Sequence, residues 1–241
     1  EADPALDVDG WDTAHKAVIL ASLAYGFPVP LEDLPVEGIR RVTQDDIAIA
    51  AELGYRIKLL ARIEHREGQV GAAVGPMLVP VDHMLASVHG VFNAVMVNGD
   101  IVGETLYYGK GAGRLPTASA VLGDIAEAAR NLASDSMHRV PAFVPHDHYG
   151  RLRPAEDQDL RCYMRLTMND HPGALARVAD CLGRRDISIA SVVQKTSDPG
   201  GFVPVVILTQ PAKEKQFSEA LAEIDASDDV GAETFRMRIL S

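Results

Sequence analysis

The sequence predicts an α+β protein: an open, mostly antiparallel sheet with helices on one face, followed by a ferredoxin-like β-α-β-β-α-β module. Three observations lead to this expectation. Residues 55–109 are runs rich in β-forming residues with turn signals between them. Helical patterns precede and follow that stretch. Residues 161–240 then alternate strand and helix patterns in the order that defines the module.

The first predicted helix carries an unusual density of charge at its beginning. Asp9 is a candidate N-cap, and Asp12 falls in the first turn, where a carboxylate interacts favourably with the helix dipole. From Ala14 to Tyr25 the residues are almost wholly apolar, so we expect this helix to be buried on most sides. Lys16 lies one turn inside it and needs a partner, and Asp12, four residues earlier, is on the same face.

The remaining elements of the first half follow in order. Thr43 begins a capping signal for a helix over residues 44–53, which Gly54 ends. Four β-rich runs occupy residues 55–109, with hairpin signals at Glu67-Gly68 and Asn98-Gly99. A helix of about sixteen residues over 117–132 comes next.

The second half predicts a separate module. We expect strands at 161–167, 188–195, 202–209 and 233–240, and helices at 173–184 and 213–226. Proline-rich residues before the module show little periodicity, which is typical of a linker. The sequence therefore predicts a first domain over 1–137, a linker over 138–157 and the module over 158–241.

Composition limits the classes of partner. The 241 residues carry a formal net charge of -11 and no basic run, which argues against a nucleic acid or an anionic membrane as the main partner. The two cysteines lack the spacing of a metal site or a disulfide framework, and no signal peptide or membrane span is visible, so we expect a cytoplasmic protein. Because the chain opens inside a charged motif, we expect it to be the C-terminal part of something longer.

The acidic lead-in is the first candidate site. Asp12 and Lys16 alone would be an ordinary helix ion pair, worth a few tenths of a kcal/mol. Glu1, Asp3 and Asp7 lie just upstream, and these extra carboxylates are well placed to hold a ligand ammonium group. Both interpretations, a structural pair and a binding site, remain open on the residues alone.

Other candidates are weaker. Gly109, Gly111 and Gly113 lead into a helix and would let a flat ring or a phosphate approach the backbone, although the same spacing suits any tight strand-to-helix turn. The turn at residues 169–173 can cap a helix or hold an amino-acid ligand. His146 and His148, like His83 and His89, lack a convincing third metal ligand, so no metal site is predicted.

Three long motifs resemble the substrate-binding half of homoserine dehydrogenases: EADPxLDVxGxDxAHK at the start, GIRRVTQDDIAIAAELGYRIKLLA, and HGVFNAVMVNGDIVGETLYYGKGAGRLPTASAV. NDHPGALARVA and ISIASVVQ resemble the C-terminal ACT regulatory domain that many bacterial members carry. The resemblance covers nearly the whole chain apart from the linker. The N-terminal nucleotide-binding half of the family is missing.

The resemblance implies NAD- or NADP-dependent interconversion of L-homoserine and L-aspartate 4-semialdehyde, on the route to threonine, methionine and isoleucine. Matched by motif, Lys16 is the acid/base lysine, Asp12 a catalytic-site aspartate, and Glu1 and Asp7 bind substrate together with Lys16. Gly113, with Gly111, lies in the loop against the cofactor. The chain alone is expected to be inactive, because the cofactor site lies mostly in the missing half.

The resemblance also implies feedback binding of threonine by the ACT module. The expected effector-binding residues are Asn169, Asp170, Gly173, Ala174, Leu175 and Gln194. A broad apolar sheet face and the habit of ACT modules to pair indicate a homodimer. The alternative from a different class is a non-catalytic amino-acid-binding and oligomerisation protein. Retention of Lys16 and its acidic neighbours favours the enzyme, whereas the lack of a dinucleotide-binding fold in the chain favours the alternative.

Overall fold

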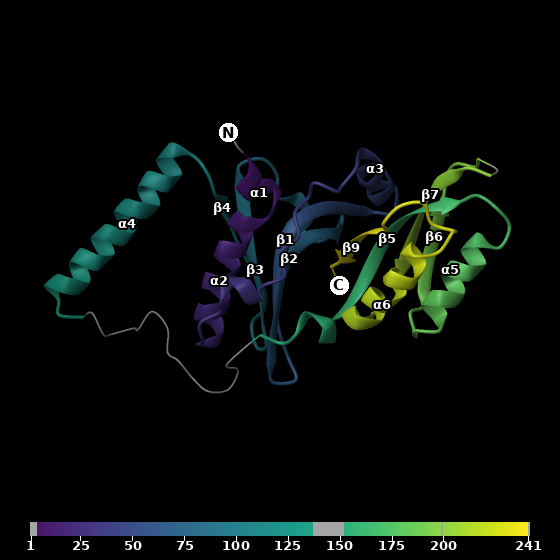
Figure 1. The fold of residues 1–241 in the computed structure, drawn as a ribbon. Coiled ribbons are helices and arrows are strands. Elements are labelled where there is room, and N and C mark those ends of the chain that lie inside the picture. The colour runs from purple at the N-terminus through teal and green to yellow at the C-terminus, as the bar shows by residue number, and fades with distance from the viewer. Residues whose placement is uncertain (1–3, 137–151, 199, 241) are drawn as a thin grey trace. The chain divides into compact units, whose positions relative to one another are not determined.

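The computed structural model describes residues 4–136, 152–198 and 200–240 (Figure 1). Contacts divide the chain into two compact units, one drawn from Glu1–Val79 and Pro145–Ser241 and the other from Pro80–Val144. Within the described residues no helix is both long enough and apolar enough to cross a membrane. The predicted linker, residues 138–157, is described only over 152–157.

The first unit begins with a short helix and a longer one, α1 (Ala5–Val8) and α2 (Trp11–Tyr25). The prediction that Asp9 caps α2 is wrong. Gly10 holds the N-cap position with φ of 84°, a left-handed conformation that glycine adopts without strain. The expected burial on most sides is also wrong, because only the small residues Ala14, Ala17 and Ala21 are buried.

A hairpin forms the first part of the sheet. Strands β1 (Tyr55–Arg66) and β2 (Gln69–Pro80) are joined at Glu67 and Gly68, whose φ angles of 52° and 75° match the predicted turn. Helix α2 packs on Val70, Ala72 and Val74 of β2. Helix α3 (Gln44–Glu52), with the predicted cap at Thr43, packs on Leu78 of the same strand. Because these β2 residues are all separated by even numbers of positions, both helices cover one face, as predicted.

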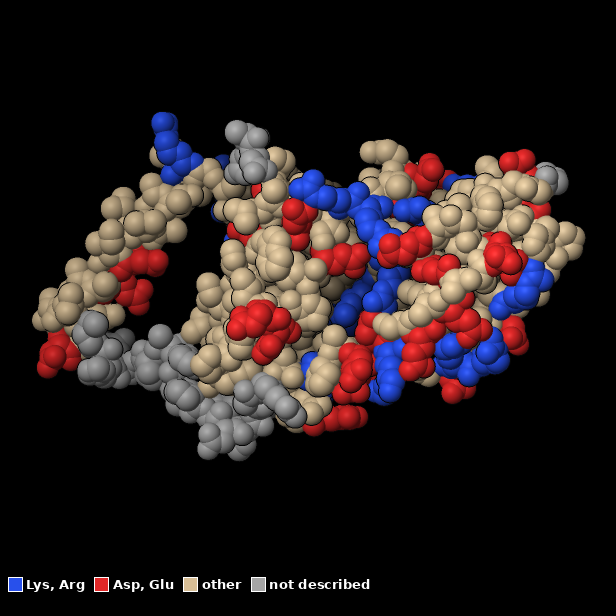
Figure 2. Space-filling view, in the orientation of Figure 1, with Lys and Arg blue, Asp and Glu red and all other residues tan. Residues whose placement is uncertain are grey.

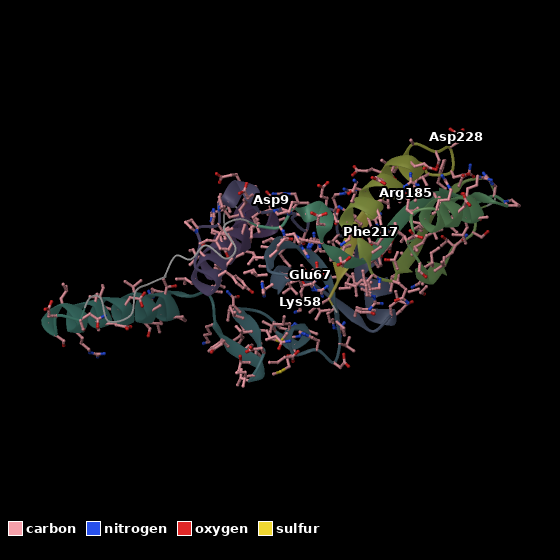
Figure 3. All side chains as sticks on the ribbon, turned by 90° about the horizontal axis from the view of Figure 1, so that it is seen from below. Asp9, Lys58, Glu67, Arg185, Phe217 and Asp228 are labelled. Carbon is pink, nitrogen blue, oxygen red and sulfur yellow. The ribbon has the colours of Figure 1, made fainter. Side chains whose placement is uncertain are left out.

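The C-terminal module has the predicted element order. It consists of β5 (Asp159–Asn169), α5 (Ala174–Gly183), β6 (Ile189–Gln194), β7 (Phe202–Thr209), α6 (Glu214–Asp225) and β9 (Phe235–Ile239), with a two-residue β8 (Ala212–Lys213) on the edge of β5. Helices α5 and α6 cover one face around the fully buried Phe217 (Figure 3), whose burial contributes about 1.5–3 kcal/mol.

The β1–β2 hairpin and the strands of the C-terminal module form one continuous sheet. Strand β9 pairs in parallel with β2 at Met77–Arg238 and Leu78–Ile239, giving a seven-stranded sheet whose main path is β1-β2-β9-β5-β7-β6. Helix α3 packs against the face of this sheet opposite α5 and α6, because Ile49 and Ala50 share a core with Tyr163 of β5 and Met237 of β9. The domain boundaries remain a prediction. Strand pairing between β9 and β2 nevertheless joins the two predicted domains.

The second unit contains a hairpin and a long helix. Strands β3 (Phe92–Gly99) and β4 (Gly103–Lys110) pair in antiparallel register, preceded by the short 3₁₀ helix η2 (Met84–Ser87). The turn predicted at Asn98-Gly99 is wrong by two residues: Gly99 pairs with Gly103, and residues 100–102 form the loop. Helix α4 (Arg114–Ala133) is longer than expected at both ends, and it buries no residue.

Candidate active site and effector turn

Lys16 and Asp12 form the ion pair that the sequence predicts. Lys16 Nζ donates to Oδ2 of Asp12 at 2.5 Å across one turn of α2. Both groups are accessible, with 55% of the lysine side chain and 44% of the aspartate side chain exposed. The expectation of a buried lysine is therefore wrong. An accessible ammonium held in one orientation by a carboxylate is a suitable proton donor for a bound small molecule.

A second ion pair fixes the start of α2. The guanidinium of Arg40 donates from Nε to Asp9 Oδ1 at 2.5 Å and from Nη2 to Oδ2 at 3.0 Å (Asp9 is labelled in Figure 3). This bidentate contact holds the pKa of Asp9 below its ordinary value. Gly38 lies directly under the α1–α2 junction, where a β-carbon would come within 2.5 Å of the carbonyl oxygen of Val8. The loop at 38–40 thus sets the position of the helix that carries Lys16.

The structure says less about the other carboxylates that the sequence predicts for the site. Asp7 is exposed on α1, and in the described part of the chain no hydrogen bond or ion pair joins it to Lys16. Glu1 lies outside the described residues, as do His146 and His148. The described residues contain no group of three metal-ligating side chains. The structure therefore joins Asp12 to Lys16 and leaves the substrate-binding roles of Glu1 and Asp7 as predictions.

The predicted glycine turn lies in the second unit, between β4 and α4. Gly113 is the N-cap of α4 with φ of 120°. A β-carbon at Gly111 would overlap the side-chain amide of Asn93. Gly113 therefore requires glycine for its conformation, and a side chain at Gly111 would displace the Asn93 amide. Bare backbone leading into the N-terminus of a twenty-residue helix is compatible with the close approach of a flat ring or an anion, so these residues fit a cofactor contact.

The turn between β5 and α5 brings several predicted effector residues together. The carboxylate of Asp170 accepts hydrogen bonds from Ser197 Oγ at 2.7 Å, from the Asp198 backbone N–H at 2.7 Å and from Gln194 Nε2 at 3.3 Å. These donors, the Ser197 hydroxyl first, hold the pKa of Asp170 below its ordinary value. The side-chain oxygen of Asn169 is buried and has no partner among the described atoms.

The three remaining effector candidates are at the start of α5. Gly173 is its N-cap with φ of 94°, Ala174 is buried and Leu175 is 38% exposed. Sequence reasoning did not anticipate Ser197 and Asp198, because nothing in the loop after β6 marks them as partners of a residue in the loop after β5. It also missed Arg40, although two adjacent arginines in an acidic chain were an available signal.

Comparisons with known proteins identify the family to which the chain belongs. Residues 1–126, more than half of the chain, match the family model described as "Homoserine dehydrogenase", and residues 163–226 match the model of the ACT domain. The chain belongs to the homoserine dehydrogenase family. Its C-terminal module is an ACT domain, as the resemblance implied.

Relatives named homoserine dehydrogenase share a large part of the sequence. That of Pseudomonas aeruginosa is 43% identical over 99% of this chain and 56% of its own length. That of Synechocystis is 40% identical over 100% of this chain and 57% of its own length. The chain therefore spans about half the length of the curated homoserine dehydrogenases that it matches.

Solved homoserine dehydrogenases have the same fold over the matched part. The structure from Thiobacillus denitrificans has a TM-score of 0.89 at 41% identity, and it is covered to 55% by the whole of this chain. The structure from S. aureus at pH 6.0 has a TM-score of 0.69 at 30% identity, with 56% of it covered. Both agree with the predicted α+β fold that ends in an ACT module.

Proposed function

We propose that the chain is the C-terminal portion of a cytoplasmic homoserine dehydrogenase that interconverts L-homoserine and L-aspartate 4-semialdehyde with NAD or NADP. The product would feed threonine, methionine and isoleucine biosynthesis, and the protein would act as a homo-oligomer. The observation that supports this proposal best is the Lys16–Asp12 pair, in a segment that matches the family model.

The chemistry asked of this chain is proton transfer. When bound, the nicotinamide supplies or accepts the hydride at the carbonyl carbon. Reduction of the semialdehyde builds negative charge on its oxygen, and the ammonium of Lys16 stabilises that charge and gives it a proton. Oxidation of the alcohol reverses the step, with the neutral amine of Lys16 taking the hydroxyl proton.

The acidic groups have two tasks in this scheme. Asp12 accepts a 2.5 Å hydrogen bond from Nζ of Lys16 and keeps it in one orientation. Asp7 and Glu1 would bind the ammonium group of the amino-acid substrate. Gly111 and Gly113 would border the cofactor, whose remaining contacts belong to the nucleotide-binding part that this chain does not contain. The chain alone is therefore expected to lack dehydrogenase activity.

The direct experiment replaces Lys16 in a complete enzyme that includes a nucleotide-binding half. Lys16→Ala is expected to lower kcat by roughly 10²–10⁴-fold, the usual contribution of a general acid–base group, while cofactor affinity stays within about twofold. Leu23→Ala, at an exposed position of the same helix, is the matched control and should retain most of the turnover. Equal losses of turnover and cofactor affinity in Lys16→Ala would contradict the catalytic role.

For the ACT module we propose binding of threonine at the β5–α5 turn. The unpartnered oxygen of Asn169 supports this, since a ligand donor would satisfy it. Calorimetric titration of the full chain with L-threonine should give heat that Asn169→Ala abolishes. Leu132→Ala, on exposed α4, is the control that should leave the titration unchanged. Heat no greater than buffer at millimolar threonine would exclude the effector role for this chain.

A further inference from the structure

A pocket opens where β2 changes its hydrogen-bonded neighbour. One edge of β2 bonds Val36 through Val74, and three residues further on the same strand bonds β9 through Met77 and Leu78. Between these contacts the loop at 35–37, strand β9 and the start of α6 diverge and leave a space of about 220 Å³. It lies apart from the Lys16–Asp12 pair and from the β5–α5 turn, since its lining includes none of their residues.

The lining of the pocket carries both positively and negatively charged side chains. Arg236 and Arg238 are two apart on β9 and therefore point to the same face of the sheet, toward Glu214 at the start of α6. Glu37 lines the opposite side on the 35–37 loop. Figure 2 shows arginine and lysine side chains gathered in a hollow near the middle of this face, flanked by acidic side chains.

The hydrogen-bond donors of the two arginines exceed the acceptors within reach. Arg236 uses Nη2 for Glu214, but its Nη1 is buried with no acceptor among the described residues. Arg238 donates from Nη1 to Gln158 Oε1 at 3.0 Å, and Nε2 of that glutamine also has no partner in the described part of the chain. Leaving a buried donor unpaired is unfavourable, so an added acceptor with negative charge would be favoured here.

Glu37 has the opposite deficiency. Its carboxylate forms no hydrogen bond or ion pair with any described residue, although Arg236, Arg41 and Arg238 act on it at longer range. The residue is exposed, yet the walls of the pocket partly desolvate its carboxyl group and raise its pKa above the ordinary value. A cationic partner would stabilise this carboxylate.

We propose that this pocket binds a free α-amino acid, with the ligand carboxylate toward Arg236 and Arg238 and its ammonium on Glu37. Glu214 is already neutralised by Arg236, so Arg238 and Glu37 leave one positive and one negative group for the ligand. The volume is below the range of about 300–1,000 Å³ typical of sites for drug-sized ligands, which limits the occupant to a small molecule of this kind.

The test begins with calorimetric titration of the full chain with the proteinogenic L-α-amino acids and L-homoserine. Each amino acid that binds is compared with its 2-hydroxy acid, which lacks the ammonium, and with its amine, which lacks the carboxylate. We expect at least one amino acid to bind at millimolar concentration or below, about tenfold or more tighter than either analogue. Equal binding of the hydroxy acid or of inorganic phosphate would indicate a plain anion site and overturn the proposal.

Variants assign the heat to the pocket. Glu37→Gln keeps the shape and removes the charge, and Arg236→Lys keeps the charge but removes Nη1. Each should weaken binding about tenfold or more. Glu32→Gln, another exposed carboxylate of the same loop region, is the matched control and should not change it. Asp170→Asn separates this site from the proposed effector turn: loss of binding in Asp170→Asn with none in Glu37→Gln and Arg236→Lys would overturn the pocket.

NMR signals of individual methyl groups locate the bound ligand directly, without relying on changes in affinity. With ¹³C-methyl alanine labelling, the ligand should shift the methyl signals of Ala73 and Ala155, which line the pocket. Ala174 beside the effector turn reports the alternative location. Shifts confined to Ala174, or no binding by any amino acid, would exclude the site. This outcome is independent of the Lys16→Ala experiment, so the two proposals can fail separately.

Discussion

The phenol of Tyr163 donates a 2.7 Å hydrogen bond to Oδ1 of Asp46, joining the first strand of the ACT module to the capping box of helix α3. Asp46 is fully buried, and its other oxygen accepts from the backbone N–H and the hydroxyl of Thr43 at 2.8 Å each. Arg165 adds a 2.8 Å contact to Oδ1. One carboxylate therefore caps a helix of the first half and anchors it to the sheet of the second.

Tyr163→Phe should destabilise the chain through this contact. Burial, followed by the Asp46 hydrogen bond, raises the pKa of Tyr163 far above its ordinary value, so its proton is retained and donated at any pH that the fold survives. Loss of a buried hydrogen bond to a charged group should lower the free energy of unfolding by about 1.5–3 kcal/mol. Urea unfolding measures this loss. Tyr107→Phe, on an exposed residue of β4, should change stability by less than about 0.5 kcal/mol.

Gly38→Ala should displace the helix that carries Lys16. The new β-carbon would lie 2.5 Å from the Val8 carbonyl oxygen and 2.7 Å from Cα of Asp9, both backbone atoms that cannot rotate away. We expect a loss of about 1–3 kcal/mol, as for overpacking. Gly123→Ala in α4, where a β-carbon meets nothing within 4 Å, should instead stabilise by about 0.5–1 kcal/mol. Thermal unfolding with similar midpoints for both variants would contradict this account of the α1–α2 junction.

Cys162 should resist alkylation in the folded protein. Burial raises its pKa to about 12, and alkylating agents react with the thiolate. Mass spectrometry after iodoacetamide treatment at pH 8 should find Cys162 unmodified in the native chain and modified after denaturation. Because the folded pKa lies above the ordinary value of 9.0, its contribution to stability is complete below about pH 9 and is lost as the pH rises toward 12. Rapid native labelling would show that this strand opens to solvent.

Glu223 should titrate near pH 2. Hydrogen bonds from Arg184 and Arg185 lower its pKa to about 2, at the surface where α5 and α6 meet (Arg185 is labelled in Figure 3). A carboxyl group with a lowered folded pKa stabilises the fold above its ordinary value of 4.5, and that contribution is lost as the pH falls toward 2. Carboxyl-carbon NMR should follow the titration, and Arg185→Gln should move it upward. No change in the variant would exclude the guanidinium as a cause.

Local sequence signals predicted most of the elements. The capping signal that begins at Thr43 marked the start of α3, and Glu67-Gly68 marked the β1–β2 turn, because capping and tight turns depend on residues close together in the chain. The Asn98-Gly99 signal failed because the register of β3 and β4 places those residues inside the ladder. Asp12 and Lys16 were found by the same local logic, as residues one helical turn apart.

Contacts between distant residues were not predictable in this way. Asp9 looked like a helix cap, and its pairing with Arg40 depends on how the loop at 38–40 folds under α1. The pocket at Arg236 and Arg238 depends on which strand lies beside β9. Alternating arginines in a strand are also what a solvated sheet face would show, so only the position of β2 gives them a binding role.

The parallel bonding of β9 with β2 has a mechanical meaning. An ACT module tethered only by a flexible linker could tumble freely and would report an effector to the rest of the chain weakly. Here β9, the last strand of the module, pairs with β2, the strand on which α2 and α3 pack. A tilt of β9 would therefore act directly on the strand beneath the helix that carries Lys16.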